Sequence, residues 1–203
     1  MTSQEIMIDI ETLSTKSNAA ILTIAALKFS REDSLKNINE YETFYKRITR
    51  SSTADFDVDP ATVEWWSKQN SEAKFEALES TDRIDLKPAL EELILFFGDI
   101  STVWSKSPDF DCVILTTAFA SCGLESPWKF YNTRCVRTIM DLANVKNWEV
   151  CSRNQHNAVF DCYGQIEALK MSFAKLGLGN QKKIEVFTPL SVRPRLLPSK
   201  YKK

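Results

Sequence analysis

Apolar runs near the start of the chain are short and are separated by polar residues, a pattern typical of an antiparallel meander. The segments 6–10, 20–29 and 42–48 are rich in β-branched and aromatic residues, and a polar stretch at 14–18 separates the first two. Runs of this length and composition predict β-strands. We therefore expect three strands in quick succession.

Helical periodicity dominates the rest of the chain. Asp59-Pro60 is a typical helix start, because an aspartate caps the first turn and a proline fits at its first position. Apolar residues at Leu90, Leu93 and Phe97 follow the helical repeat. Helices are expected to begin at residue 59 and to span 71–78, 86–97, 109–121, 135–143 and 157–176, with short strands at 102–105 and 129–131. Together these elements predict an α/β fold, a mixed sheet flanked by helices.

The composition is that of an ordinary soluble domain of 203 residues with 43% hydrophobic residues. No apolar run approaches the roughly 18 residues that a membrane span needs, and the first residues do not resemble a signal peptide. The five cysteines form no CxxC pair and are odd in number. These features favour reduced thiols, a cytoplasmic location and no membrane partner.

Charge is unevenly distributed along the chain. Residues 182–203 carry seven basic residues and one acid, which leaves 19 basic and 26 acidic residues in 1–181. We therefore divide the chain into a domain at 1–180 and a basic tail at 181–203. The tail is either a solvated end or a segment that contacts nucleic acid, and charge alone does not decide between these interpretations.

Two carboxylates stand close together on the first expected strand. Asp9 and Glu11 are two residues apart, so both side chains point to one face of the strand, while Ile8 and Ile10 point to the other. Such a pair repels itself unless a cation lies nearby. Taken alone, it is equally consistent with two solvated surface acids.

Two further acids and the only histidine extend this set. Asp111 continues the apolar stripe of its expected helix, although Asp109 could serve equally well as an acid in the first turn. Asp161 follows His156 by five residues, which is about 140° around a helix. The two can converge if His156 lies in the loop before the helix and Asp161 in its first turns. Otherwise they are a loop histidine and an ordinary N-terminal acid.

Hard oxygen ligands of this kind suit Mg²⁺ or Mn²⁺ rather than Zn²⁺. Two such ions about 3.5–4 Å apart can activate a water and stabilise the leaving oxygen of a phosphodiester. A histidine with a pKa near its usual value of about 6.5 can take the proton from that water.

Three segments resemble the exonuclease motifs of the DEDDh 3′–5′ exonuclease superfamily. They are DIETLS at 9–14, SPDFDCVIL at 107–115 and HNAVFD at 156–161, and they occur in the family's order. The stretches DPATVEWWSKQ at 59–69 and YNTRCVRTI at 131–139 are similar to a narrower branch that contains phage exonuclease A, exodeoxyribonuclease VIII-like proteins and a mycobacterial exoribonuclease. The resemblance extends from about residue 5 to residue 176.

The resemblance implies a ribonuclease H-like fold with a five-stranded mixed sheet, and it favours Asp111 over Asp109. It implies an active site with two divalent ions, Mg²⁺ or Mn²⁺, and a histidine as general base. The metal ligands would be Asp9, Glu11, Asp111 and Asp161, and the base would be His156. The resemblance also implies that Thr12 and Leu13 meet the 3′-terminal nucleotide. We further expect a second group of residues to contribute to substrate binding: Trp65, Trp66, Arg134 and Arg137.

The chain departs from the family before its second motif, where Ser105, Ser107 and Pro108 replace the usual Gly and Asn residues. The tandem tryptophans are also compatible with core packing, and one of the two arginines with a helix cap or an ion pair.

The function expected first is 3′–5′ hydrolysis of single-stranded DNA to nucleoside monophosphates. The alternatives are an exoribonuclease, a nucleic-acid-binding protein with an inactive site, and a proofreading subunit of a polymerase.

Overall fold

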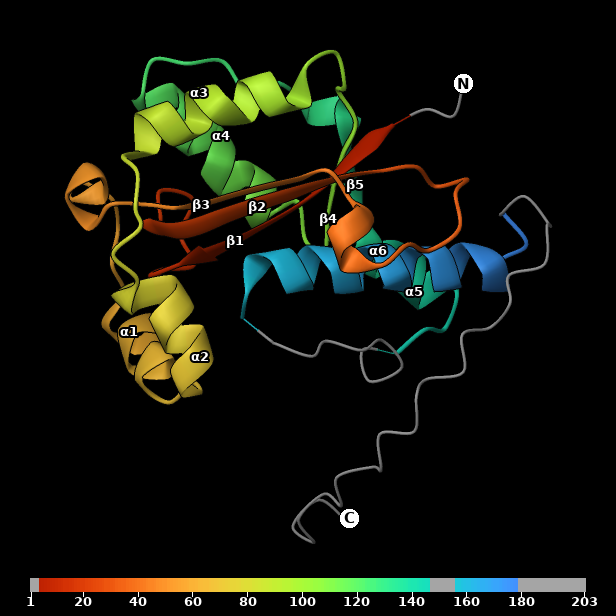
Figure 1. Ribbon diagram of the computed structural model, residues 1–203, viewed down its shortest axis with the longest axis horizontal. Helices are drawn as coiled ribbons and strands as arrows, with labels where there is room; N and C mark the ends of the chain where they lie inside the picture. Colours follow the sequence, from red (N-terminus) through yellow and green to blue (C-terminus); the bar gives the residue numbers. More distant parts are fainter. Residues whose placement is uncertain (1–3, 147–155, 179–203) are drawn as a thin grey trace, which may run out of the picture.

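The computed structural model describes residues 4–146 and 156–178, and it contains the expected mixed sheet (Figure 1). The strand order is β3-β2-β1-β4-β5. The three N-terminal strands pair antiparallel, which confirms the predicted meander, and β4 and β5 run parallel to β1. The strands are β1 (Glu5–Thr12), β2 (Ile21–Phe29), β3 (Thr43–Arg47), β4 (Val103–Ser105) and β5 (Thr133–Cys135).

Helices cover both faces of the sheet. In Figure 1, α3 (Leu86–Phe97) and α4 (Asp111–Ser121) lie on one side, and α5 (Val136–Leu142) and α6 (Ala158–Lys175) on the other. Successive side chains of β1 point to opposite faces of the sheet, so each pair of helices packs against a different set of β1 residues. Ile6, Ile8 and Ile10 pack against α3 and α4, whereas Met7 packs against α5 and α6. By the same alternation, Asp9 and Glu11 belong to the face that α6 covers.

A small helical unit closes the carboxyl end of β1. It comprises α1 (Pro60–Ser67), α2 (Ser71–Lys74) and the π-helical turn η3 (Phe75–Glu79). The side chain of Asp59 accepts a hydrogen bond from the Ala61 amide, which confirms the predicted helix start. Trp66, Ala73 and Ala77 of this unit pack against Leu13 and Leu22, so the unit holds the chain where β1 ends.

The strand predicted at 129–131 is wrong. Residues Phe130–Asn132 form the 3-10 turn η4, and the edge strand β5 begins only at Thr133. Phe130 is 87% exposed and Tyr131 64% exposed, so the aromatic residues that favoured a strand are not buried against anything. Strand propensity depends on such packing, which explains the shift along the chain. Two further 3-10 turns are η1 (Ile38–Glu40) and η2 (Arg50–Thr53).

The basic tail expected at 181–203 lies outside the described residues. Within residues 4–146 and 156–178, none of the helices has the length and hydropathy needed to cross a bilayer.

Candidate active site

The carboxyl half of β1 brings two acids to the face covered by α6. Asp9 lies opposite Ala25 of β2, and Glu11 lies opposite Thr23. A register shift between Glu11 and Thr12 follows, and regular pairing ends there. The alternation expected from the sequence therefore holds, and both carboxylates lie at the open end of a central strand.

Helix α4 contributes the third acid through its first residue. Asp111 is 4% exposed, and its Oδ1 accepts a hydrogen bond from the Ile10 amide at 3.3 Å. This bond joins the start of α4 to the strand that carries Asp9 and Glu11. Asp109 is exposed instead, so burial separates two aspartates that helical periodicity alone could not.

Helix α6 contributes the fourth acid, and the histidine lies just before it. The side chain of Asn157 caps the helix by accepting from the Val159 and Phe160 amides. His156 lies outside the helix with φ of 68°, a left-handed conformation that non-glycine residues rarely adopt. Its amide donates to Asp161 Oδ2 at 3.0 Å. The predicted arrangement, with the histidine in the loop and the aspartate in the first turn, is confirmed.

Three of the four acids could share one cation as the structure stands. One ligand oxygen from each of Asp9, Glu11 and Asp161 lies within 4.8 Å of the others. Asp111 lies outside this group but close enough for its charge to raise the pKa of both Asp9 and Glu11, after the larger effect of burial. The four carboxylates therefore form one electrostatic unit.

Burial and mutual repulsion make the ionised forms of these four acids unfavourable when no cation is bound. Burial is the main cause in each case, and neighbouring acids add to it at Asp9 and Glu11. The pKa of Asp9 is raised well above its usual value, that of Glu11 to about 8, that of Asp111 to about 7 and that of Asp161 to about 6. Among the described residues, none of the salt bridges involves any of these four acids. Clustered, acceptor-only groups of this kind fit hard divalent cations.

Two residues that sequence patterns did not single out also act on this unit. Gln165 is 6% exposed, and its Nε2 donates to Asp9 Oδ1 at 2.7 Å. The positive charge of Lys106, which follows β4, lowers the pKa of Asp161, although burial raises it more. Gln165 follows Asp161 by four residues and so shares its helix face, a spacing that could have identified it.

The imidazole of His156 packs against the tandem tryptophans. Its ring centroid lies 4.7 Å from that of Trp65 and 6.2 Å from that of Trp66, both edge-to-face. This burial lowers the pKa of His156 below its usual value. Helix α1 thus forms one wall around the histidine.

The expected substrate residues divide into buried and exposed groups. Trp66 is 1% exposed, and its Nε1 donates to the Thr12 carbonyl at 2.9 Å. Thr12 and Leu13 are also buried, whereas Trp65 is 41% exposed. Trp66 therefore packs as a core residue that holds the end of β1, and Trp65 is the tryptophan that faces outward.

The two arginines lie beside the end of the parallel strands. Both are exposed. The guanidinium of Arg134 donates to the carbonyls of Tyr131 and Thr133, and the amide of Arg137 donates to the Lys106 carbonyl at 3.4 Å. The second contact places Arg137 next to the lysine whose charge reaches Asp161.

Solved structures share this architecture. The zinc-bound complex of E. coli exonuclease I with single-stranded DNA has a TM-score of 0.62 at 15% identity, over 87% of this chain and 42% of exonuclease I. Its complex with a dA16 oligonucleotide has a TM-score of 0.61 at 15% identity, over 86% and 42%. The chain spans about two fifths of exonuclease I, and the likeness shows a ribonuclease H-like exonuclease fold.

Sequence comparison leads to the same group of enzymes. The exodeoxyribonuclease of enterobacteria phage T4 is 23% identical over 230 residues, which cover 93% of this chain and 97% of that enzyme. The model of the family described as the 3′-5′ exoribonuclease Rv2179c-like domain matches residues 4–173. The chain therefore belongs to the Rv2179c-like family of 3′-5′ exonuclease domains.

Proposed function

We propose that this protein is a metal-dependent exonuclease that removes nucleoside monophosphates from the 3′ end of single-stranded DNA. The observation that carries the proposal is a cluster of four partly or fully buried carboxylates whose pKa values are all raised and none of which forms a salt bridge among the described residues. An arrangement this costly is expected where a bound cation offsets the charge.

The ligand set fits two divalent ions, Mg²⁺ or Mn²⁺. Asp9, Glu11 and Asp161 are close enough to share one ion, and Asp111 reaches the same unit from the start of α4. Bound there, the ions would offset the acids' repulsion and polarise the scissile phosphate. Gln165 holds one oxygen of Asp9 through its amide, which leaves the other oxygen as a ligand.

His156 is proposed as the general base. Because burial against α1 lowers its pKa, the imidazole is neutral at pH 7 and can accept a proton from the attacking water. The bond from its amide to Asp161 ties its loop to a metal ligand, so the base stays next to the reacting centre.

Substrate contacts are proposed along the two walls of the site. Trp65 and Arg137 are exposed near the histidine and near Lys106, where a base and a phosphate could reach them. Thr12 and Leu13 would meet the terminal nucleotide where β1 ends. Trp66 would support that contact from beneath, and Arg134 would contact the strand at the sheet edge.

DNA is the proposed substrate because the phage T4 relative is an exodeoxyribonuclease and aligns over nearly the whole of both chains. The exonuclease I structures with similar architecture contain single-stranded DNA. An exoribonuclease is the second candidate, since the matching family is described by that activity.

The test uses DNA and RNA strands of one sequence, labelled at the 5′ end, with Mg²⁺ or with EDTA. We expect stepwise shortening from the 3′ end with Mg²⁺ alone, and kcat/KM at least tenfold higher for DNA. The opposite ratio would assign the enzyme to RNA. A protein that binds both strands and cleaves neither would be an inactive relative, and the proposal would be wrong.

A matched pair of variants tests whether activity depends on Asp111 itself or on any acid in this part of the chain. Asp111→Asn removes a buried ligand, whereas Asp109→Asn removes an exposed acid two residues away. Only the first should abolish cleavage. Equal activity of the two variants would contradict the assignment of Asp111.

A further inference from the structure

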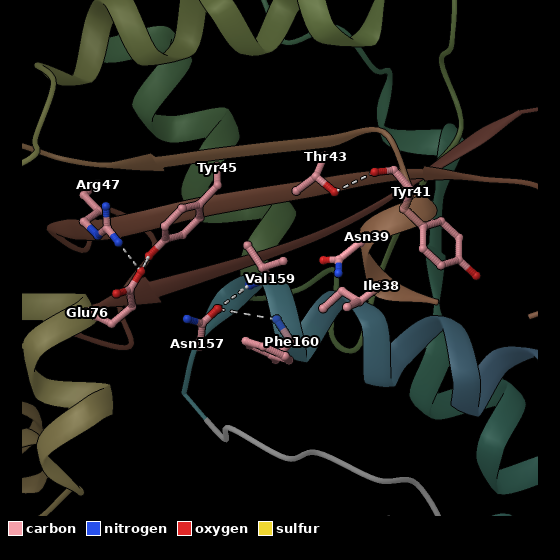
Figure 2. Close-up of a pocket in the computed structure, with 10 residues that line it drawn as sticks. All are labelled: Ile38, Asn39, Tyr41, Thr43, Tyr45, Arg47, Glu76, Asn157, Val159 and Phe160. Carbon is pink, nitrogen blue, oxygen red and sulfur yellow. Dashed lines mark hydrogen bonds and ion pairs between the residues drawn. The ribbon is translucent and has the colours of Figure 1, made fainter. Parts of the chain in front are cut away.

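A cleft opens at the edge strand β3, two strands from the acids of β1. It has a volume of about 590 Å³ and lies between β3, the turn η1 and the first turn of α6 (Figure 2). Volumes of 300–1,000 Å³ are typical of small-ligand sites. At the start of α6 the cleft is lined by the cap residue Asn157 and by Val159 and Phe160, which stand between His156 and Asp161 in the sequence.

The strand register connects this cleft to the acids. Asp9 pairs with Ala25, and Ala25 pairs with Tyr45 of β3. Glu11 pairs in the same way with Thr23, and Thr23 with Arg47. Residues in register point to the same face of a sheet, so Tyr45 and Arg47 share the face of the two acids, two strands away. Two strand spacings amount to about 10 Å. The charge of Glu11 contributes to the raised pKa of Tyr45, after burial and the contacts with Glu76.

The wall formed by β3 carries one aromatic ring, that of Tyr45, and its position is fixed by contacts with Glu76 and Arg47. The hydroxyl of Tyr45 donates to Glu76 Oε1 at 2.9 Å, and the guanidinium of Arg47 lies over the ring, 5.1 Å from its centroid. Arg47 also pairs with Glu76. Tyr45 is thus fixed by its hydroxyl and by its ring, and the ring of Phe160 lines the cleft from α6 (Figure 2).

Charge at the cleft favours a flat, uncharged group over a phosphate. The positive charge of Arg47 is committed to Glu76, so it offers little attraction to an anion. Aromatic rings bind nucleobases by stacking, and each stacked base contributes about 1–3 kcal/mol. The aromatic lining and the position two strands from the catalytic acids together indicate a base of the substrate strand.

We propose that this cleft binds a base of the substrate on the 5′ side of the scissile phosphate, stacked against Tyr45 and Phe160. The inference rests on the proposed nuclease function. The terminal nucleotide is expected on the other side of the histidine, by Leu13 and Trp65, so the cleft holds a different nucleotide. In this arrangement, residues of β3 and α6 would make the enzyme bind a strand in preference to a single nucleotide.

The first test compares strand binding in four variants. Fluorescence anisotropy is measured with 5′-labelled DNA of two to ten nucleotides, with Ca²⁺ in place of Mg²⁺. Tyr45→Leu and Phe160→Leu remove the proposed stacking and should raise Kd about 5- to 150-fold. Tyr45→Phe keeps the ring, and Phe130→Leu alters an exposed ring outside the cleft. Tyr45→Phe loses the hydroxyl that fixes the ring but should lose less affinity than Tyr45→Leu, and Phe130→Leu should bind as the wild type does.

Kinetics distinguish a binding role from a structural one. The readout is kcat/KM for a decanucleotide divided by kcat/KM for the p-nitrophenyl ester of thymidine 5′-monophosphate, which occupies the scissile position alone. Tyr45→Leu should lower this ratio at least fivefold. An equal loss on both substrates would mean that Tyr45 is structural, and no loss would mean that the cleft does not touch the strand; either result overturns the inference. A wild-type protein that cleaves neither substrate would refute the nuclease proposal, while the binding assay would still test the cleft.

Photo-crosslinking locates the base directly. DNA with 5-iodouracil at the penultimate position should label the peptide that contains Tyr45 or the one that contains Phe160. Labelling elsewhere would overturn the inference. If free 5-iodo-dUMP labels the cleft and the strand does not, the cleft retains the released nucleotide, and the proposal for the strand is wrong.

Discussion

The acids at the two ends of β1 lie in opposite electrostatic environments. Glu5 at the amino end is 3% exposed, and its Oε2 accepts from Trp104 Nε1 at 3.1 Å and pairs with Arg31 Nε at 2.7 Å. Asp9 and Glu11 at the carboxyl end have no cationic side-chain partner among the described residues, and their pKa values are raised. One strand therefore carries a carboxylate that the fold satisfies and two that repel each other. The difference separates an acid whose charge the fold neutralises from two acids that we propose bind metal.

The largest expected effect is the loss of activity in Asp9→Asn. Removing this carboxylate removes a proposed metal ligand, and kcat should fall about 10³-fold or more, because a metal-stabilised transition state is worth several kcal/mol. Calorimetric titration with Mn²⁺ should show weaker binding. Activity near that of the wild type would place the metal ligands elsewhere.

His156→Ala should lower kcat about 10²- to 10⁴-fold, the usual range for a positioned base. Because burial lowers the pKa of His156, the wild-type rate should rise with pH to a plateau that begins below about pH 7, where the imidazole is neutral. The variant should lose this acidic limb and still bind Mn²⁺. Single-turnover rates at saturating metal from pH 5 to pH 8 provide the measurement. An unchanged limb in the variant would exclude His156 as the base.

Without metal, the stability of the folded protein should fall as pH rises, because the acids of the site have raised pKa values. The folded-state pKa values of Glu11, Asp111 and Asp161, about 8, 7 and 6, exceed their usual values near 4. Between those values the folded protein binds more protons than the unfolded chain, so stability falls as pH rises from about 4 to 8. In EDTA we expect Tm to drop by more than about 5 °C over this range.

Two controls belong to the same thermal denaturation experiment. Mg²⁺ should raise Tm most at the alkaline end, where the acids are ionised. Asp9→Asn should melt at an equal or higher temperature in EDTA and show a weaker pH dependence. A Tm in EDTA that rises between pH 4 and pH 8 would show that other groups dominate.

The smallest effect is expected at the amino end of the strand. Glu5→Gln keeps an oxygen that can accept from Trp104 but removes the charge that Arg31 pairs with. Arg31 is about half exposed, so water can replace part of that pairing. We expect a loss of about 1–2 kcal/mol in the free energy of unfolding and kcat within twofold of the wild type. Urea denaturation and the exonuclease assay measure the two quantities. A large loss of activity would erase the distinction between the two ends of β1.

Much of this architecture could be predicted from the sequence because its signals are local. The N-terminal strands, the Asp59-Pro60 helix start and the acids Asp9 and Glu11 follow from periodicity and spacing. The strand placed at 129–131 failed because the burial that makes aromatic residues favour strands is a tertiary property, and Phe130 is exposed.

The environment of the site depends on contacts between distant segments. Trp65 and Trp66 are identical neighbours in the sequence, yet only Trp66 is buried, because its indole reaches the Thr12 carbonyl 54 positions away. The pairing of Gln165 with Asp9 spans 156 positions. The cleft lined by Tyr45 and Phe160 likewise exists only once β3 and the start of α6 have come together in the folded chain.

Helix α6 also determines the point during synthesis at which the proposed nuclease site is complete. Asp161 and Gln165 lie on the last described helix, and the other three acids precede Asp161 by at least 50 residues. During synthesis, a ribosome-bound chain that lacks α6 has the strand acids but neither the helix that covers them nor the fourth carboxylate. Truncated products of early termination share this deficiency. If the four acids act as we propose, the order of the elements would delay nuclease activity until α6 has been made, which would protect the nucleic acids around the ribosome from incomplete enzyme.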